Sequence, residues 1–173
     1  PDVIGDNNSW LIKTENSETT IKAQILIDGT DLGDIGAMVG AKYDLGMEAK
    51  DKVDELVGTK SSDIIQDLTY TAILEESSEK EMVVPSPTYD PSIFYCACEM
   101  LCDDVDEQPH SCQTMMDYAK LPNDKYLINW PIYGNDIYLN IIEQNQQERK
   151  ESLKLAKTKT LDFVYFIQNE LGY

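Results

Sequence analysis

The sequence predicts a mixed α/β fold of the α+β kind: an N-terminal β-meander, with one strand entering a covered sheet, followed by a mainly helical region. Short apolar runs separated by polar turns indicate the strands. An apolar residue at every third or fourth position over residues 146–171 indicates a long helix. With 173 residues, of which 42% are hydrophobic, the chain has the size and composition of an ordinary globular domain.

The meander occupies the first part of the chain. Its apolar runs cover residues 3–4, 10–12 and 20–27 and are separated by polar turns at residues 5–8 and 15–18. The third run begins with alternating apolar and polar residues and ends, at Ile25–Ile27, as a continuous apolar stretch. This change predicts a strand that is covered on both faces.

The third run is followed by a turn rich in aspartate and glycine, Asp28–Asp34, and then by small residues up to Ala41. We expect a tight turn and a short helix over residues 35–41. Because glycine inside a helix costs about 1 kcal/mol relative to alanine, we interpret the small residues as a sign of close packing against another backbone.

Two helices and a strand are predicted in the second part of the chain. Residues 63–75 follow a Ser61-Ser62 cap and have one apolar face, which predicts a helix. Residues 125–130 are a predicted strand that ends at Pro131, whose peptide bond is a candidate for the cis isomer. A short helix is predicted to follow, ending near Gln144.

The last predicted helix, residues 146–171, has end signals on both sides. Asn145 and Glu148 form a capping-box pattern, and Gly172 is a C-terminal stop. Its predicted buried stripe consists of Leu153, Ala156, Thr160, Val164, Ile167 and Leu171.

The net charge of −18 excludes some classes of partner and is unevenly distributed. Nucleic acids and anionic membrane surfaces are bound through Lys and Arg, so we expect neither as a partner. Residues 61–117 carry 13 acidic residues and one lysine, whereas residues 118–173 carry 7 acidic and 7 basic residues. Together with four prolines, this charge predicts an irregular, solvated acidic loop at 77–117. We expect two domains, 1–60 and 61–173, or a single domain, 1–173.

The ends and the hydropathy of the chain add two expectations. No stretch approaches the roughly 20 apolar residues that span a bilayer, so we expect no membrane segment. The sequence begins at Pro1 and has no signal-peptide pattern, which suggests a processed or excised segment.

The four cysteines leave three states open: disulfides, free thiols and a metal site. Their spacing, C-x-C-x3-C-x9-C from Cys96 to Cys112, fits zinc poorly. Two disulfides would fit an oxidising compartment, and a secreted or periplasmic location would follow. The acidic run at 103–107 fails the calcium-loop pattern, because Pro109 and Met115 stand where glycine and glutamate are needed.

Catalytic residues are not indicated by any motif. His110 is the only histidine and lies in the predicted loop, so we interpret it as a solvent-exposed loop residue and assign neither a catalytic residue nor a metal ligand. The candidate substrate-binding residues are Trp130, Tyr133 and Asn135, because aromatic faces beside an amide bind sugar hydroxyls and flat rings. The alternative is that Trp130 and Tyr138 are core residues on either side of a tight turn.

Nucleotide binding is weighed at the Asp28–Asp34 turn. The Gly33, Gly36 and Gly40 spacing is not G-x-G-x-x-G, and the sequence contains no P-loop. A strand that leads through a glycine-rich turn into a helix is nevertheless how a dinucleotide is often bound. The aspartates of this turn would repel phosphate and would suit ribose hydroxyls or backbone capping better.

Four segments of the sequence resemble the FAD-dependent oxidoreductases, in particular the group labelled "xanthan lyase related". They cover residues 25–40, 63–70, 120–136 and 161–172. The resemblance implies an oxidoreductase with FAD as cofactor, a small-molecule or carbohydrate-related substrate, and residues 61–173 on the substrate side. It also implies that the chain is an internal segment, whose partner is the remainder of a full-length flavoprotein, since the G-x-G-x-x-G motif is missing. The isolated segment would then be inactive.

The resemblance also implies which residues lie near the cofactor. The family's Asp-Ala-Thr turn matches Asp28, Gly29 and Thr30, with Gly29 in place of the usual alanine. With Gly33 and Asp34, these are the predicted cofactor-binding residues. The rival interpretation is a non-enzymatic module that binds glycans or a protein, and a third is an interaction domain clipped by its cysteines.

Overall fold

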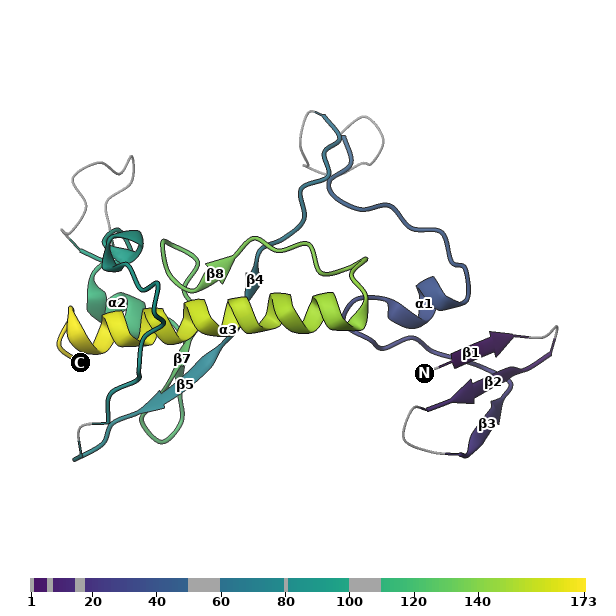
Figure 1. Ribbon diagram of the computed structural model, residues 1–173, viewed down its shortest axis with the longest axis horizontal. Coiled ribbons are helices and arrows are strands. Elements are labelled where there is room, and N and C mark those ends of the chain that lie inside the picture. The colour runs from purple at the N-terminus through teal and green to yellow at the C-terminus, as the bar shows by residue number, and fades with distance from the viewer. Residues whose placement is uncertain (1, 6–7, 15–17, 50–59, 80, 100–109) are drawn as a thin grey trace. The chain divides into compact units, whose positions relative to one another are not determined.

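The computed structural model describes residues 2–5, 8–14, 18–49, 60–79, 81–99 and 110–173 (Figure 1). They form two compact units, Pro1–Ile65 and Gln66–Tyr173, which we call unit 1 and unit 2. Strands and helices both occur, so the predicted mixed α/β class is confirmed. The domain boundary after residue 60 stays a prediction.

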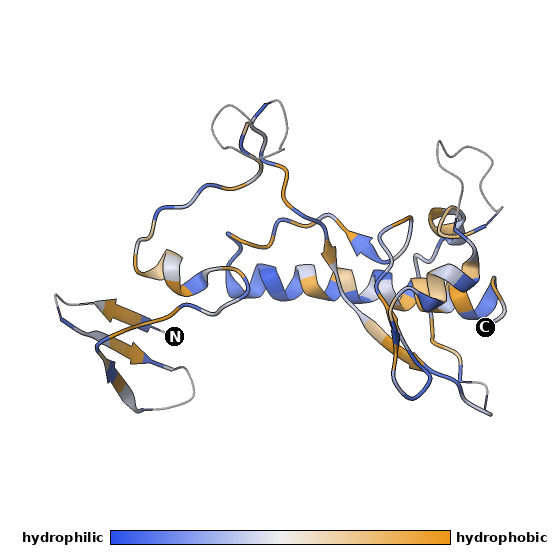
Figure 2. Ribbon diagram, turned by 180° about the vertical axis from the view of Figure 1, so that it is seen from behind, coloured by the Kyte–Doolittle hydropathy of each residue, from blue (hydrophilic) through white to orange (hydrophobic). Residues whose placement is uncertain are grey.

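Unit 1 begins with the predicted meander. Strands β1 (Asp2–Gly5), β2 (Trp10–Lys13) and β3 (Thr20–Ala23) form an antiparallel sheet in the order β1-β2-β3. Val3 pairs with Ile12, and Ile12 pairs with Ile21, on one face of this sheet. In Figure 2 these strands are mostly orange, the colour of hydrophobic residues. Residues 6–7 and 15–17 of the two predicted turns lie outside the described residues.

The third strand differs from the prediction at its end. β3 ends at Ala23, and Ile25 and Ile27 beyond it are 78% and 84% exposed. The apolar run is therefore not covered on both faces within the described residues. A continuous apolar run marks a segment suited to burial, but burial also needs a neighbouring strand or helix, which the run itself does not specify.

The rest of unit 1 contains the predicted short helix. α1 spans Asp34–Met38 and follows the glycine-rich turn. Farther along, Met47 and Ser62 pair in an isolated antiparallel bridge. Gly46 is required beside this bridge, since its φ is +91° and an added Cβ would lie 2.0 Å from the Ser62 carbonyl oxygen.

The helix predicted over residues 63–75 is wrong. In unit 2 this region forms β4 (Leu68–Thr69) and β5 (Ala72–Glu75). In β5, Ala72 and Leu74 are half-buried while Ile73 and Glu75 are exposed, which is the two-residue period of a strand. The apolar residues at 65, 68 and 72 fit a helix as well, but the alternation in β5 and the pairing with other strands decide the outcome.

Three more strands complete the sheets of unit 2. They are β6 (Lys120–Leu121), β7 (Lys125–Ile128) and β8 (Asp136–Ile137), arranged in the orders β5-β7-β6 and β4-β8. β7 confirms the strand predicted before Pro131. Two other predictions are wrong: no cis peptide bond occurs in the described part of the chain, and the segment up to Gln144 is not helical. There, Asn140 instead accepts the Ile142 amide in a local turn, at 3.2 Å.

The long helix is confirmed as α3, Gln146–Asn169, together with its capping box. The Asn145 side chain accepts the backbone amides of Gln147 and Glu148, and the Glu148 carboxylate accepts the Asn145 amide at 2.9 Å. Four of the six predicted stripe residues are buried, and Leu153 and Leu171 are half-buried.

The segment predicted as an irregular, solvated acidic loop supplies part of the core of unit 2, so that prediction is corrected. It contains η1 (Pro91–Phe94), a 3₁₀ helix, and α2 (Cys112–Asp117). The Asp90 carboxylate caps η1, and Pro91 starts it, because proline is favoured in the first turn of a helix. Its buried side chains pack with those of α3 and β7 in one cluster: Phe94, Ala97, Cys98, Met115, Met116, Ile128, Trp130, Phe163, Val164, Phe166 and Ile167.

Candidate functional site

The predicted cofactor-binding residues come together in one hydrogen-bonded turn before α1. One Asp28 carboxylate oxygen accepts the amide and the hydroxyl of Thr30, at 2.9 and 2.7 Å, and the other accepts the Gly36 amide at 2.7 Å. The Thr30 hydroxyl in turn accepts the Asp34 amide at 2.8 Å. Asp28 and Thr30 thus bind the donors at the start of the helix, and we call Asp28–Gly36 the aspartate turn.

The geometry of the aspartate turn has an electrostatic consequence. The hydrogen bond from the Thr30 hydroxyl, followed by those from the Thr30 and Gly36 amides, lowers the pKa of Asp28. Gly33 precedes α1 with φ +68°, a conformation that glycine adopts without strain. An added Cβ on Gly29 or Gly33 would meet nothing within 4 Å, so this side of the turn is open.

The predicted substrate residues lie in a second turn, Trp130–Asn135, which we call the tryptophan turn. Asn135 is fully buried. Its Oδ1 accepts the Trp130 amide at 2.9 Å, and its Nδ2 donates to the carbonyls of Ile128 and Tyr70, at 3.1 and 3.3 Å, and to Thr160 Oγ1 at 3.4 Å. The polar groups of Asn135 are therefore used inside the protein.

Trp130 is also a core residue, as the alternative interpretation expected. It is 4% exposed, and its Nε1 donates to the Ala97 carbonyl at 2.7 Å. Tyr138, in contrast, is 52% exposed and is not a core residue. Of the three predicted substrate residues, only Tyr133 presents its side chain to solvent, with 53% exposed. Substrate contact by Trp130, Tyr133 and Asn135 stays a prediction.

The sequence did not indicate the residues that bind Asp136, directly after the tryptophan turn. Thr69 donates to the Asp136 carboxylate, and the Lys159 ammonium donates to the Asp136 carbonyl. Burial lowers the pKa of Lys159, and the charges of Asp136 and Asp67 oppose this shift. Because the pairing of β4 with β8 and the packing of α3 against β8 bring these partners together, no local pattern in the sequence indicates them.

The cysteines are in the disulfide state, one of the three states left open. Cys98 and Cys112 are bonded, with an S–S distance of 2.06 Å, and Cys96 is disulfide-bonded as well. Cys102 and the acidic run at 103–107 lie outside the described residues. Elsewhere in the described ranges, no group of three or more His, Cys, Asp or Glu is placed to hold a metal ion.

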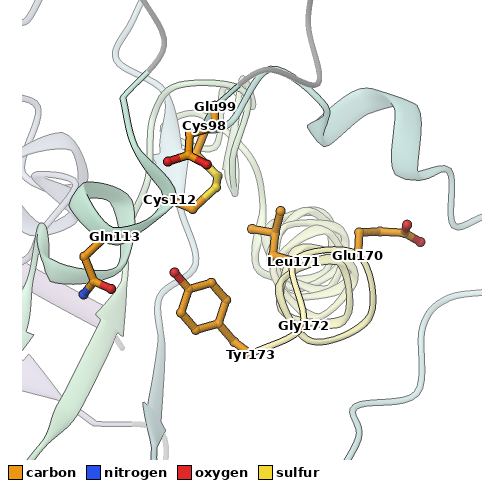
Figure 3. A pocket seen from close by; sticks show the side chains of 8 residues that line it. All are labelled: Cys98, Glu99, Cys112, Gln113, Glu170, Leu171, Gly172 and Tyr173. Atoms are coloured by element: carbon orange, nitrogen blue, oxygen red, sulfur yellow. A yellow bond between two sulfur atoms is a disulfide. The ribbon is translucent and has the colours of Figure 1, made fainter.

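A cavity of about 510 Å³ lies beside the Cys98–Cys112 disulfide. Figure 3 shows Tyr173 across from the disulfide, whereas the Glu170 side chain points away from it. Burial, and then the charges of Glu99 and Asp117, raise the pKa of Tyr173. The cavity contains no residue of the predicted sites.

His110 is exposed, as predicted, and its ring lies edge-on to Trp130 with 5.6 Å between centroids. This ring contact is a packing contact, and we assign no catalytic role to His110. None of the described helices has both the length and the hydrophobicity that crossing a bilayer requires.

Comparison with known families is decisive. The family described as FAD dependent oxidoreductase matches residues 2–172, nearly the whole chain. The chain belongs to this family. Its cofactor is therefore FAD. No curated protein and no solved structure matches the chain.

Within this FAD-dependent oxidoreductase, the aspartate turn does not fit the pyrophosphate of FAD. The amides of Thr30, Asp34 and Gly36, which an anion at the start of α1 would need, already bind Asp28 and Thr30. The Asp28 carboxylate also puts a negative charge where phosphate would lie. α1 itself is only five residues long. The sequence-based interpretation that the aspartates suit backbone capping describes this geometry.

Proposed function

We propose that the chain is part of a flavin-dependent oxidoreductase that acts on a carbohydrate-related substrate and that the G-x-G-x-x-G motif for the FAD pyrophosphate lies outside this sequence. The observation that carries the oxidoreductase part is the family match over residues 2–172. The carbohydrate-related substrate is what the resemblance of the sequence implies. The aspartate turn supports the second part, because the Thr30, Asp34 and Gly36 amides are bound internally.

On this proposal the two turns have different tasks. The aspartate turn lies on the cofactor side and approaches a part of FAD other than its phosphates, through the open backbone at Gly29 and Gly33. The tryptophan turn lies on the substrate side, where the exposed Tyr133 ring offers a flat apolar face and a hydroxyl. The finer "xanthan lyase related" assignment belongs to the same proposal.

An FAD titration tests the cofactor part. The chain is titrated with FAD in a calorimeter while the visible spectrum of the purified protein is recorded. We expect no tight binding by this chain and stoichiometric binding by a longer chain that includes a G-x-G-x-x-G segment. A longer chain that folds but does not bind FAD would contradict the proposal.

The substrate part is tested by anaerobic bleaching of bound flavin. Mono- and oligosaccharides are added to the FAD-loaded longer chain, and the loss of the visible flavin absorbance is followed. We expect at least one sugar to bleach the flavin. Bleaching by amines or simple alcohols but by no sugar would show that the carbohydrate assignment is wrong.

A second candidate function is a non-enzymatic module that binds a glycan or a protein. It is favoured by the exposure of Tyr133 on a turn that is otherwise held inside the protein. Glycan binding without any flavin chemistry would distinguish it. Tyr133→Ala is the informative variant for this test, since Trp130→Ala would remove a core side chain.

The cysteines support a proposal about location. Disulfides persist in oxidising compartments, and Cys96, Cys98 and Cys112 are all bonded. We therefore assign the protein to a secreted or periplasmic location, which fractionation of the source cells would test. The partner proposed for the chain is the remainder of a full-length flavoprotein.

A further inference from the structure

The backbone of Tyr133 adopts a conformation that does not suit its side chain. Its φ is +48°, in the left-handed region, where residues with a Cβ are strained and glycine and asparagine are better tolerated. The hairpin between β6 and β7 needs the same region at Asn123 and Asp124, and there the chain has the residue types that tolerate it. Glu99, at φ +37°, and Tyr133 are the described residues outside glycine, asparagine and aspartate that adopt it, and Tyr133 is the one with a bulky aromatic side chain.

The surrounding turn holds Tyr133 in this conformation from both sides. Trp130 before it donates to the Ala97 carbonyl, and Asn135 after it bonds to Trp130, Tyr70 and Thr160. Gly134, the next residue, packs closely on Trp130, since an added Cβ would lie 2.2 Å from the Trp130 carbonyl oxygen. The strain is thus imposed by well-packed neighbours, which is the condition under which it persists.

Packing gives no reason for a tyrosine at this position. Its side chain is 53% exposed, so it contributes less to burial than the core aromatics Trp130 and Phe94, which are 4% and 0% exposed. Asparagine or glycine at position 133 would relieve the strain, at the cost of the covered part of the Tyr133 ring. Strained, exposed residues of this kind cluster at ligand contacts, where function outweighs stability.

We infer that Tyr133 is the ligand contact of the tryptophan turn, with its ring stacking on the apolar face of a pyranose sugar, and that Trp130 and Asn135 do not touch the ligand. The inference rests on the proposed carbohydrate function and narrows it to one residue. A pyranose has a flat face of C–H groups bordered by hydroxyls, which matches an exposed phenol ring with its hydroxyl. The preformed turn lowers the cost of ordering this ring on binding.

The test compares stability with binding in the same variants. The chain is screened against an array of neutral and acidic oligosaccharides, and the strongest binder is then titrated by calorimetry. Tyr133→Asn should raise the melting temperature, because strain is released, and should weaken binding at least tenfold. Tyr133→Phe should keep the affinity within about threefold. Tyr138→Asn, at a tyrosine that is 52% exposed, is the matched control and should leave binding unchanged.

Each of three results would overturn the inference: no binding of any oligosaccharide, unchanged binding by Tyr133→Asn, or a lower melting temperature for Tyr133→Asn. The flavin measurements separate this inference from the proposed function. Sugar-dependent bleaching with unchanged KM in Tyr133→Asn would keep the oxidoreductase function and reject the contact. Tyr133-dependent sugar binding by a longer chain that binds no flavin would keep the contact and reject the oxidoreductase function.

Discussion

The aspartate turn of unit 1 and the tryptophan turn of unit 2 are each organised by one side chain, but in opposite environments. Asp28 is an exposed carboxylate that accepts backbone and hydroxyl donors within eight residues of itself. Asn135 is a fully buried amide whose partners include Tyr70, 65 residues earlier, and Thr160, 25 residues later. The hydrogen bonds of the charged Asp28 side chain can be changed by pH, whereas those of the buried, neutral Asn135 side chain depend on packing alone.

The largest expected effect comes from removing the buried organiser. Asn135→Ala leaves the Trp130 amide and the Ile128 carbonyl buried without their partner. At about 1–3 kcal/mol for each unsatisfied group, we expect a loss of about 4 kcal/mol in the free energy of unfolding of unit 2. Urea unfolding followed by Trp130 fluorescence, in a Trp10→Phe background, measures it.

Asn169→Ala is the matched control, because Asn169 is exposed and donates only to the neighbouring Glu170 side chain. It should change stability by less than about 0.5 kcal/mol. If both variants lose the same small amount, the amide network does not organise the tryptophan turn, and the contrast between the two turns is wrong.

This contrast also explains how much the sequence could predict. The aspartate turn, α1 and the capping box of α3 depend on contacts within a few residues, and the sequence predicted all three. The burial of Asn135 depends on Tyr70, beside β4, and on Thr160 of α3, and an asparagine beside aromatic residues does not indicate such distant partners.

The same reason underlies the incorrect helix at 63–75 and the incorrect solvated loop at 77–117. Leu68–Glu75 is compatible with both periods, and pairing with β7 and β8 decides between them. In the acidic segment, prolines and charge obscured the few apolar residues that reach the core, such as Phe94 and Met115. The φ of Tyr133, on which the proposed ligand contact rests, cannot be deduced from the sequence either.

The second prediction asks whether the packing around Trp130 depends on the Cys98–Cys112 disulfide. Cys98 lies next to Ala97, whose carbonyl accepts Trp130 Nε1, and is bonded to Cys112 at the start of α2. For a loop with a sequence separation of 14, the double variant Cys98→Ala/Cys112→Ala should lose about 3 kcal/mol of stability. Thermal unfolding followed by near-UV circular dichroism measures this loss.

The double variant leaves the bond of Cys96 in place and so serves better than a general reductant. Dithiothreitol on the wild-type chain is the comparison and should lower the melting temperature at least as much. An unchanged melting temperature in the double variant would show that the packing of Phe94 and Met115 stabilises this part of unit 2 without the disulfide.

The third prediction sharpens the account of the buried network by removing one of two donors. Thr160 and Asn135 both donate to the Tyr70 carbonyl. Thr160→Val keeps the volume and leaves that carbonyl with one partner, so we expect a loss of about 1 kcal/mol in unfolding free energy. Thr158→Val is the control on the same helix, since the Thr158 hydroxyl bonds only to the Lys154 carbonyl of its own helix. Equal effects of the two variants would show that Asn135 alone satisfies Tyr70.

The smallest expected effect tests the charged organiser and is confined to the aspartate turn. Because hydrogen bonds lower the pKa of Asp28 below 3.8, its charged form is favoured in the folded turn. That stabilisation is fully present above the unfolded pKa and is lost as the pH falls through the folded pKa, so the turn should loosen only in acid below about pH 4.

Two-dimensional NMR should show the amide signals of Thr30 and Gly36 shifting together in this range, and Asp28→Asn should abolish the shift. The signals of the tryptophan turn should not follow them, because Asn135 has no charge to lose. If the Trp130 amide titrated in step with that of Thr30, the two turns would not differ in the way that their buried and exposed organisers require.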